Sequence, residues 1–89
     1  MKRVRVIYSG SVHGVGFRYT VLSLAERFGI RGWVKNLPDG RVELAAEGRE
    51  DTVINFLNRI DERMSGYIQN KETTWAETKD KFTSFTVRY

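Results

Sequence analysis

The residues best placed to do chemistry lie in a glycine-rich stretch, Gly-Ser-Val-His-Gly-Val-Gly-Phe-Arg, which runs from Gly10 to Arg18. Gly14 and Gly16 can adopt positive φ, so consecutive backbone N–H groups can point into one concavity that attracts an anion. Arg18 would add a planar, always-charged guanidinium suited to the paired oxygens of a phosphate. These residue types and their spacing indicate a phosphate site over residues 11–18. A glycine-rich turn without a ligand remains the alternative.

Two other phosphate motifs do not match this stretch. A P-loop requires a Lys followed by Ser or Thr, and no such pair follows the glycines. A dinucleotide fingerprint requires an acidic residue at the end of a following parallel strand, in a doubly wound fold. Neither requirement is met, so the sequence does not indicate a nucleotide-binding loop of either kind.

The hydrophobic pattern predicts the elements that must hold this loop. Alternating apolar residues, with many β-branched and aromatic ones, are typical of strands, whereas apolar residues at helical spacing are typical of amphipathic helices. The predicted strands cover residues 2–9, 30–36, 41–47 and 82–89, and the predicted helices cover residues 17–28 and 50–64. The loop then lies between a strand and a helix N-terminus, where unpaired N–H groups and the helix dipole favour an anion.

The order of these elements is βαββαβ, the ferredoxin-like split βαβ. We expect an α+β sandwich with two helices on one face of an antiparallel sheet, in a single domain over residues 1–89. The turn Leu37-Pro38-Asp39-Gly40 should join the second and third strands in a hairpin. Residues 65–80 are weakly specified, although residues 67–74 could add one more strand.

Charge is unevenly distributed along the chain, whose net charge is +4. Residues 1–36 hold seven Lys and Arg against one Glu, and residues 37–89 hold eight against ten acidic residues. The basic N-terminal part suits a small phosphate compound or a nucleic acid, although a solvated basic surface would have the same composition. The chain has no Cys, and no apolar run approaches the roughly 18 residues of a membrane span. We therefore expect a cytoplasmic protein with no membrane contact.

A second distinctive stretch, Gly-Trp-Val-Lys-Asn-Leu-Pro-Asp-Gly-Arg-Val, runs from Gly32 to Val42. Asn36 lies where the second predicted strand ends and the turn begins. Asn at such a position commonly bonds its own backbone. The spacing does not show whether Asn36 comes near the loop at 11–18, so on these residues alone the local role is the better interpretation.

Together the two stretches resemble the acylphosphatase family. The first is similar to the family motif G-x-V-[QH]-G-V-G-F-R, and the second to G-[aromatic]-V-[basic]-N-x-x-x-G-x-V-x-x-x-x-x-G. The similarity covers about residues 4–64 and resumes in the C-terminal strand. The matching residues are Gly10, Val12, His13, Gly14, Val15, Gly16, Phe17 and Arg18 in the first motif, and Gly32, Trp33, Val34, Lys35, Asn36, Gly40, Val42 and Gly48 in the second.

This resemblance implies an enzyme that hydrolyses small acyl phosphates to a carboxylate and inorganic phosphate, without a metal or cofactor. It implies two catalytic residues: Arg18 would bind the phosphate, and Asn36 would orient the attacking water. The implied phosphate-binding residues are His13, Gly14, Val15, Gly16, Phe17 and Arg18. We expect a monomer with no nucleic-acid partner.

Three features depart from the usual family pattern or extend it. His13 occupies a position where Gln is the usual residue, and residues 65–80 lack the Pro-containing segment common in bacterial and archaeal members. The ending Phe-Thr-Val-Arg-Tyr resembles that of the animal members, in which the terminal carboxylate lies near the catalytic Arg. We therefore hypothesise that the Tyr89 carboxylate orients Arg18.

Two other functions are compatible with this topology. One is a non-catalytic module that binds phosphate or carbamoyl phosphate, because hydrogenase-maturation proteins begin with a similar module. The other is an RNA-binding ferredoxin-like domain. RNA-recognition domains carry exposed aromatics on a central strand, and residues 41–45, Arg-Val-Glu-Leu-Ala, have none.

Overall fold

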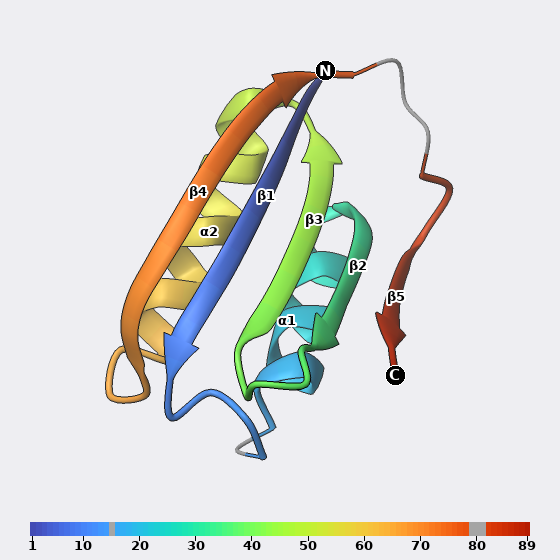
Figure 1. Ribbon diagram of the computed structural model, residues 1–89. Helices are drawn as coiled ribbons and strands as arrows, with labels where there is room; N and C mark the ends of the chain where they lie inside the picture. The colour runs from blue at the N-terminus through green and yellow to red at the C-terminus, as the bar shows by residue number, and fades with distance from the viewer. Residues whose placement is uncertain (15, 79–81) are drawn as a thin grey trace.

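The computed structural model describes residues 1–14, 16–78 and 82–89. Both helices lie on one face of a single five-stranded sheet (Figure 1). The elements are β1 (Lys2–Gly10), α1 (Phe17–Phe28), β2 (Arg31–Asn36), β3 (Val42–Gly48), α2 (Glu50–Arg63), β4 (Ile68–Glu77) and β5 (Phe85–Arg88). The predicted α+β, ferredoxin-like architecture is confirmed. Neither helix, within the described residues, is long and apolar enough to cross a membrane.

The strand order in the sheet is β4-β1-β3-β2-β5. β1 pairs antiparallel with both β3 and β4, and β2 pairs antiparallel with β3. β5 pairs parallel with β2, so the sheet is mixed, and the prediction of an antiparallel sheet is wrong. The last strand of the βαββαβ unit is β4, and β5 is an additional strand that begins at Phe85 rather than at residue 82.

The C-terminal strand was predicted as the last strand of the βαββαβ unit because β4 is exposed. Its first residue, Ile68, is half-buried, and the residues that follow in the strand, 69–77, are exposed. Hydrophobic alternation develops when one face of a strand is buried and the other is not. Because β4 is an exposed edge strand, its sequence shows little hydrophobic alternation. The more apolar segment 82–89 was therefore predicted as the last strand of the unit.

The core lies between the sheet and the two helices. Side chains from β1 and β3 that alternate toward the helices are buried, and α2 contributes the predicted apolar stripe. The buried cluster consists of Val4, Val6, Tyr8, Val12, Phe17, Val21, Leu24, Ala25, Ile30, Val34, Val42, Leu44, Ala46, Val53, Phe56, Leu57, Ile60 and Met64. This packing fixes α1, and with it the loop at its N-terminus, against the sheet.

The predicted hairpin between β2 and β3 is confirmed. The backbone N–H of Leu37 donates to the carbonyl of Arg41 (2.7 Å), and that of Gly40 donates to the carbonyl of Leu37 (3.0 Å). Asn36, the last residue of β2, is paired with Val42 of β3. β2 therefore ends at the same end of the sheet as β1, where α1 begins (Figure 1).

Candidate active site

The loop between β1 and α1 has the backbone geometry that its glycines predict. Gly14 has φ 80° and Gly16 has φ 75°, and Gly16 is the N-cap residue of α1. At the start of the loop, the N–H of Ser11 donates to the carbonyl of Tyr67 (2.9 Å). The loop thus turns tightly into the helix N-terminus. Val15, which belongs to the predicted phosphate site, lies outside the described residues.

The first turn of α1 is held by an aromatic contact with the sheet. Phe17 is buried, and its ring centroid lies 5.0 Å from that of Tyr8 on β1. Burial, and to a smaller extent the charge of Asp61, raises the pKa of the Tyr8 hydroxyl well above its ordinary value. Tyr8 therefore stays protonated at neutral pH, and its role at the start of α1 is packing.

A pocket of about 300 Å³ lies at this end of the molecule. It brings Asn36, at the end of β2, into the same cavity as the loop and Arg18. The lining residues are Val12, His13, Gly14, Gly16, Phe17, Arg18, Tyr19 and Asn36. Asn36 thus lies beside the loop, which the sequence pattern by itself did not establish.

Arg18 is held on one side by the C-terminal end of the chain. Its Nη1 donates to the backbone carbonyl of Arg88 (3.1 Å), and its guanidinium carbon lies 4.7 Å from the ring centroid of Tyr89. A guanidinium has five N–H donors, so a bond to Arg88 leaves capacity for a phosphate. The contacts come from a carbonyl and a ring, and the role of the Tyr89 carboxylate stays a prediction.

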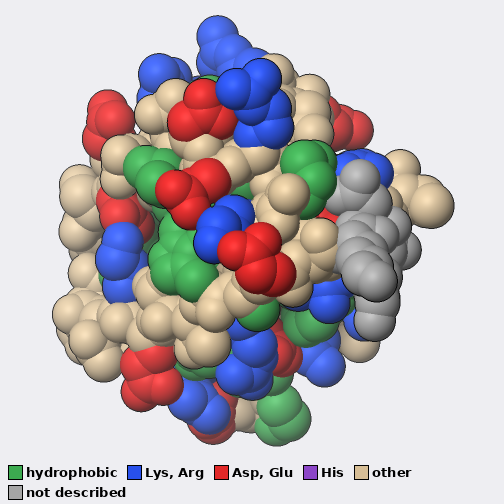
Figure 2. All heavy atoms as spheres, turned by 90° about the horizontal axis from the view of Figure 1, so that it is seen from above, with side chains coloured by type: hydrophobic (Ala, Val, Ile, Leu, Met, Phe, Trp, Pro, Cys, Tyr) green, Lys and Arg blue, Asp and Glu red, His purple; other side chains and the backbone are tan. Residues whose placement is uncertain are grey.

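Charge at the pocket favours an anion. Among the described residues, no acidic side chain lines the pocket, and the first turn of α1 carries none. At the opposite end of the molecule, basic and acidic side chains are interspersed (Figure 2). Lys2 there lies 2.5 Å from Glu77 and 3.8 Å from Glu50. At that end the charges pair with one another. At the pocket, by contrast, Arg18 lies beside the unpaired N–H groups at the start of α1, so this is where the described surface favours an anion.

Among the described lining residues, Tyr19 was not predicted from the sequence, whereas Val12 lies within the predicted stretch 11–18 but was not named as a binding residue. Val12 is buried, whereas Tyr19 is exposed and its hydroxyl lies 3.0 Å from that of Tyr89. Tyr19 directly follows Arg18, but neighbouring residues of a helix point in different directions. The orientation of α1 about its own axis therefore decides that both side chains line the same pocket. His13 is exposed at the rim. The described residues contain no group of His, Cys, Asp and Glu arranged to hold a metal ion.

Comparison with known proteins identifies the family. The family model for acylphosphatase matches residues 4–87. The chain belongs to the acylphosphatase family. An acylphosphatase of Methanospirillum hungatei is 54% identical over 69 residues, which cover 78% of this chain and 76% of the relative. One from Lactobacillus gasseri is 37% identical over 91 aligned positions and covers the full length of both chains.

The fold agrees with solved members of the family. The crystal structure of acylphosphatase from Bacillus subtilis superposes with a TM-score of 0.91 at 33% identity, and the match covers the full length of both chains. The family and the fold that the sequence resemblance implied are therefore both confirmed.

Proposed function

We propose that this member of the family is an acylphosphatase, which hydrolyses the carboxyl–phosphate bond of small acyl phosphates to a carboxylate and inorganic phosphate. In this proposal the reaction needs no metal or cofactor. The supporting observation is the single pocket that combines the glycine loop, Arg18 and Asn36. Each of the three supplies a different part of the chemistry.

The loop and Arg18 would hold the phosphate. Backbone N–H groups at the start of α1 supply fixed dipoles, and Arg18 supplies a charged fork for two phosphate oxygens. Phosphoryl transfer develops charge on the equatorial oxygens, so donors already in place stabilise the transition state without reorganisation. The contacts of Arg18 with Arg88 and Tyr89 hold the guanidinium before any ligand binds.

Asn36 would place the attacking water. Its amide can both donate and accept hydrogen bonds, and it is fixed at the end of β2 by pairing with Val42. The water oxygen attacks phosphorus, the bond from phosphorus to the acyl oxygen breaks, and the carboxylate leaves with the bonding electrons. A carboxylate is a good leaving group and needs little protonation. A phosphate oxygen of the substrate takes the proton of the water.

Arg18→Lys tests the phosphate anchor. The variant keeps the positive charge but loses the fork, so we expect kcat/KM for acetyl phosphate to fall about 10- to 100-fold, as for the loss of a hydrogen bond to a charged group. Arg27→Lys is the matched control, because Arg27 lies in the last turn of the same helix, at its opposite end. Equal activity of the two variants would contradict the assignment of Arg18.

Asn36→Ala tests the water-positioning role. We expect kcat to fall by about 10²-fold or more, while inorganic phosphate still binds with nearly unchanged affinity. Asn58→Ala, at an exposed position of α2, is the control for loss of an amide. Near-normal turnover in Asn36→Ala would refute the mechanism, and a large loss of wild-type activity with a chelator would reveal a metal.

The same preparation distinguishes the other functions. Phosphate binding without acetyl phosphate turnover would support a non-catalytic phosphate or carbamoyl phosphate module. We expect no binding in a titration with single-stranded RNA at low salt, and a monomer by sedimentation. The cytoplasmic location also stays a prediction, which cell fractionation would check.

A further inference from the structure

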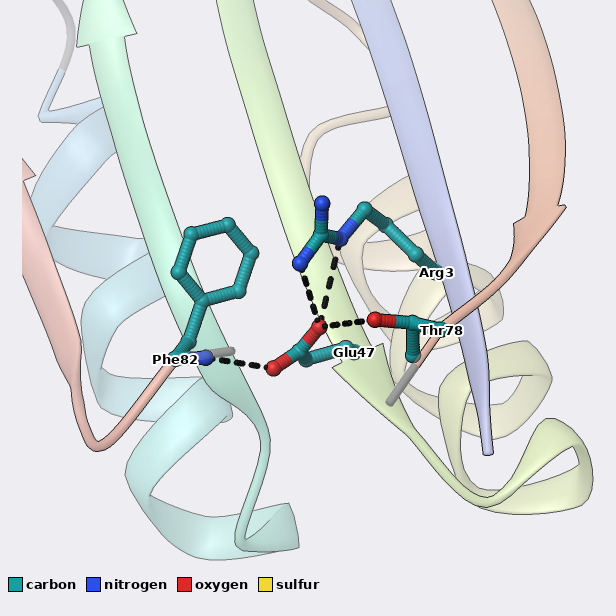
Figure 3. Close-up of polar contacts among 4 residues, drawn as sticks. All are labelled: Arg3, Glu47, Thr78 and Phe82. Carbon is teal, nitrogen blue, oxygen red and sulfur yellow. Dashed lines mark hydrogen bonds and ion pairs between the residues drawn. The ribbon is translucent and has the colours of Figure 1, made fainter. Parts of the chain in front are cut away.

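Glu47, near the end of β3, is a buried carboxylate on the sheet face opposite the helices. Its exposed fraction is 0%, and three groups converge on it (Figure 3). The N–H of Phe82 donates to Oε1 (2.6 Å), and Thr78 Oγ1 (3.0 Å) and Arg3 Nη2 (2.9 Å) donate to Oε2. A buried charge is tolerated only when it is paired and hydrogen-bonded in this way.

Two of the partners of Glu47, Thr78 and Phe82, lie at the two described ends of the segment between β4 and β5, and the third, Arg3, lies on β1. Thr78 directly follows β4 at one edge, and Phe82 precedes β5 at the other edge. The guanidinium carbon of Arg3 also lies 4.5 Å from the ring centroid of Phe82. Glu47 therefore holds both described ends of this crossing segment, residues 78 and 82, at one point of the sheet.

The charge of Glu47 is stabilised by this arrangement. Burial alone would raise the pKa of the carboxyl, but the hydrogen bonds from Phe82, Arg3 and Thr78 and the charge of Arg3 outweigh burial and lower the pKa. Arg31 lies opposite Glu47 on β2 in the strand register. The carboxylate is thus ionised at neutral pH and remains a strong acceptor for the crossing segment.

β5 is a short edge strand whose own contacts are with β2 and with the helix layer: the guanidinium carbon of Arg88 lies 4.7 Å from the ring centroid of Trp33, and the ring centroid of Phe85 lies 6.3 Å from that of Phe56. The strand has four residues, and its strand pairing is with β2 alone among the described strands. The N–H of Gly32 donates to the carbonyl of Ser84 (3.0 Å) just before the strand, and Phe85 and Val87 are only partly buried. A short edge strand of this kind gains little stability by itself, so its docking depends on how its preceding segment is held.

Arg88 at the end of β5, and Tyr89 after it, contact two residues that line the pocket, Arg18 and Tyr19. The carbonyl of Arg88 accepts a hydrogen bond from Arg18, and the ring of Tyr89 lies beside the guanidinium. The Tyr89 hydroxyl also lies 3.0 Å from that of Tyr19. The position of Arg18 is therefore coupled to the position of β5.

We propose that Glu47 is a positioning residue for Arg18: it anchors the crossing segment at Phe82, which docks β5, whose end holds the guanidinium in place to bind phosphate. This inference rests on the proposed role of Arg18. Glu47 is at the opposite end of β3 from the pocket, so it acts without touching the ligand. The residue that carries the effect is Arg18.

The chain contains a matched control for this proposal. Glu43 lies on the same strand and the same face, is only 9% exposed, and bonds an arginine of β1, since Arg5 Nε donates to its Oε2 (2.6 Å). Among the described residues, its side-chain hydrogen bond is to Arg5 alone, whereas Glu47 also bonds Thr78 and Phe82. Replacing each Glu in turn separates the loss of a β1–β3 ion pair from the loss of the anchor.

The experiment compares Glu47→Ala with Glu43→Ala in the full chain. The measurements are the Kd for inorganic phosphate, kcat and KM for acetyl phosphate, and hydrogen exchange of the Gly32 amide. For Glu47→Ala we expect the phosphate Kd and KM to rise about tenfold, the equivalent of one hydrogen bond to a charged group, with faster Gly32 exchange. For Glu43→Ala we expect phosphate binding and Gly32 exchange to stay within twofold of the wild-type values. An equal effect of the two variants, or an unchanged phosphate Kd in Glu47→Ala, would overturn the inference.

Two milder variants keep the test decisive if Glu47→Ala does not fold. Glu47→Gln retains an acceptor for the Phe82 N–H, so its phosphate Kd should lie between those of the wild type and Glu47→Ala. Thr78→Val removes one hydroxyl at constant shape, and we expect a two- to threefold rise in the phosphate Kd. Wild-type phosphate affinity in both would overturn the inference.

A double variant separates this inference from the proposed function. In an Arg18→Ala background, Glu47→Ala should cause no further loss of phosphate affinity, because the residue through which it acts is gone. A further loss as large as in the wild-type background would show a general structural effect and overturn the inference. Unchanged phosphate affinity in Arg18→Ala alone would instead overturn the proposed function, and this inference with it.

Discussion

Gly16 and Gly29 lie at opposite ends of α1 with nearly the same backbone conformation. Gly16 has φ 75° and ψ 19°, and Gly29 has φ 68° and ψ 29°. A Cβ added at either position would meet nothing within 4 Å. Replacing either by Ala therefore creates no clash, and its cost is the left-handed conformation itself, about 1–2 kcal/mol.

The location of each glycine decides whether the cost lowers the free energy of unfolding or the affinity for phosphate. Gly29 lies at the far end of the helix from the pocket, so the whole cost of Gly29→Ala should lower the free energy of unfolding. In Gly16→Ala the loop can respond in two ways. If it keeps its geometry, the free energy of unfolding falls. If it relaxes, phosphate binding must restore the geometry, and the affinity for phosphate falls by up to about 5- to 30-fold. The losses in stability and affinity at Gly16 should sum to the stability loss at Gly29.

Urea unfolding and a phosphate titration measure both quantities in the same samples. Each kcal/mol of stability should shift Tm by about 4–8 °C in a domain of this size. We expect Gly29→Ala to lose stability and keep its phosphate affinity. A Gly16→Ala variant that loses neither stability nor affinity would refute the reasoning, as would an equal loss of phosphate affinity in both variants.

Three further predictions concern stability. Gly32→Ala should destabilise more than Gly29→Ala in urea unfolding, because its Cβ would lie 1.9 Å from the Ala45 carbonyl oxygen; equal losses would contradict the close approach of β2 and β3. Phe56→Ala should lose about 3–5 kcal/mol, since Phe56 is fully buried, and a loss below about 1 kcal/mol in the same assay would contradict this packing. The lowered pKa of Glu47 means that its carboxylate stabilises the fold above its unfolded pKa, and that this contribution is lost as the pH falls through the lower folded value. The urea midpoint of Glu47→Gln should therefore depend less on pH than that of the wild type below the ordinary pKa of 4.5, and parallel acid profiles would count against it.

Much of the fold was predictable because hydrophobic periodicity marks the side chains that face the helix-covered core. The stripe of α2 and the apolar alternation in β1 and β3 follow from this, although β3 is buried on both faces, with Glu43 and Glu47 on the face away from the helices. The β2–β3 turn follows from Pro38, Asp39 and Gly40. The positions of the last two strands were not predictable in the same way. β4 is exposed along most of its length, and β5 is a four-residue strand whose parallel pairing with β2 is a contact between distant segments.

By itself, the sequence determined that the stretch between β1 and α1 can make a tight turn into the helix, because Gly14 and Gly16 can adopt positive φ without the steric cost that a side chain would add. It also determined which donors are available there. Only the tertiary structure decided that Asn36 and the end of β5 lie beside Arg18. The physical reason is that such proximity depends on strand pairing between distant segments, which brings the ends of β1, β2 and β5 to one end of the sheet (Figure 1).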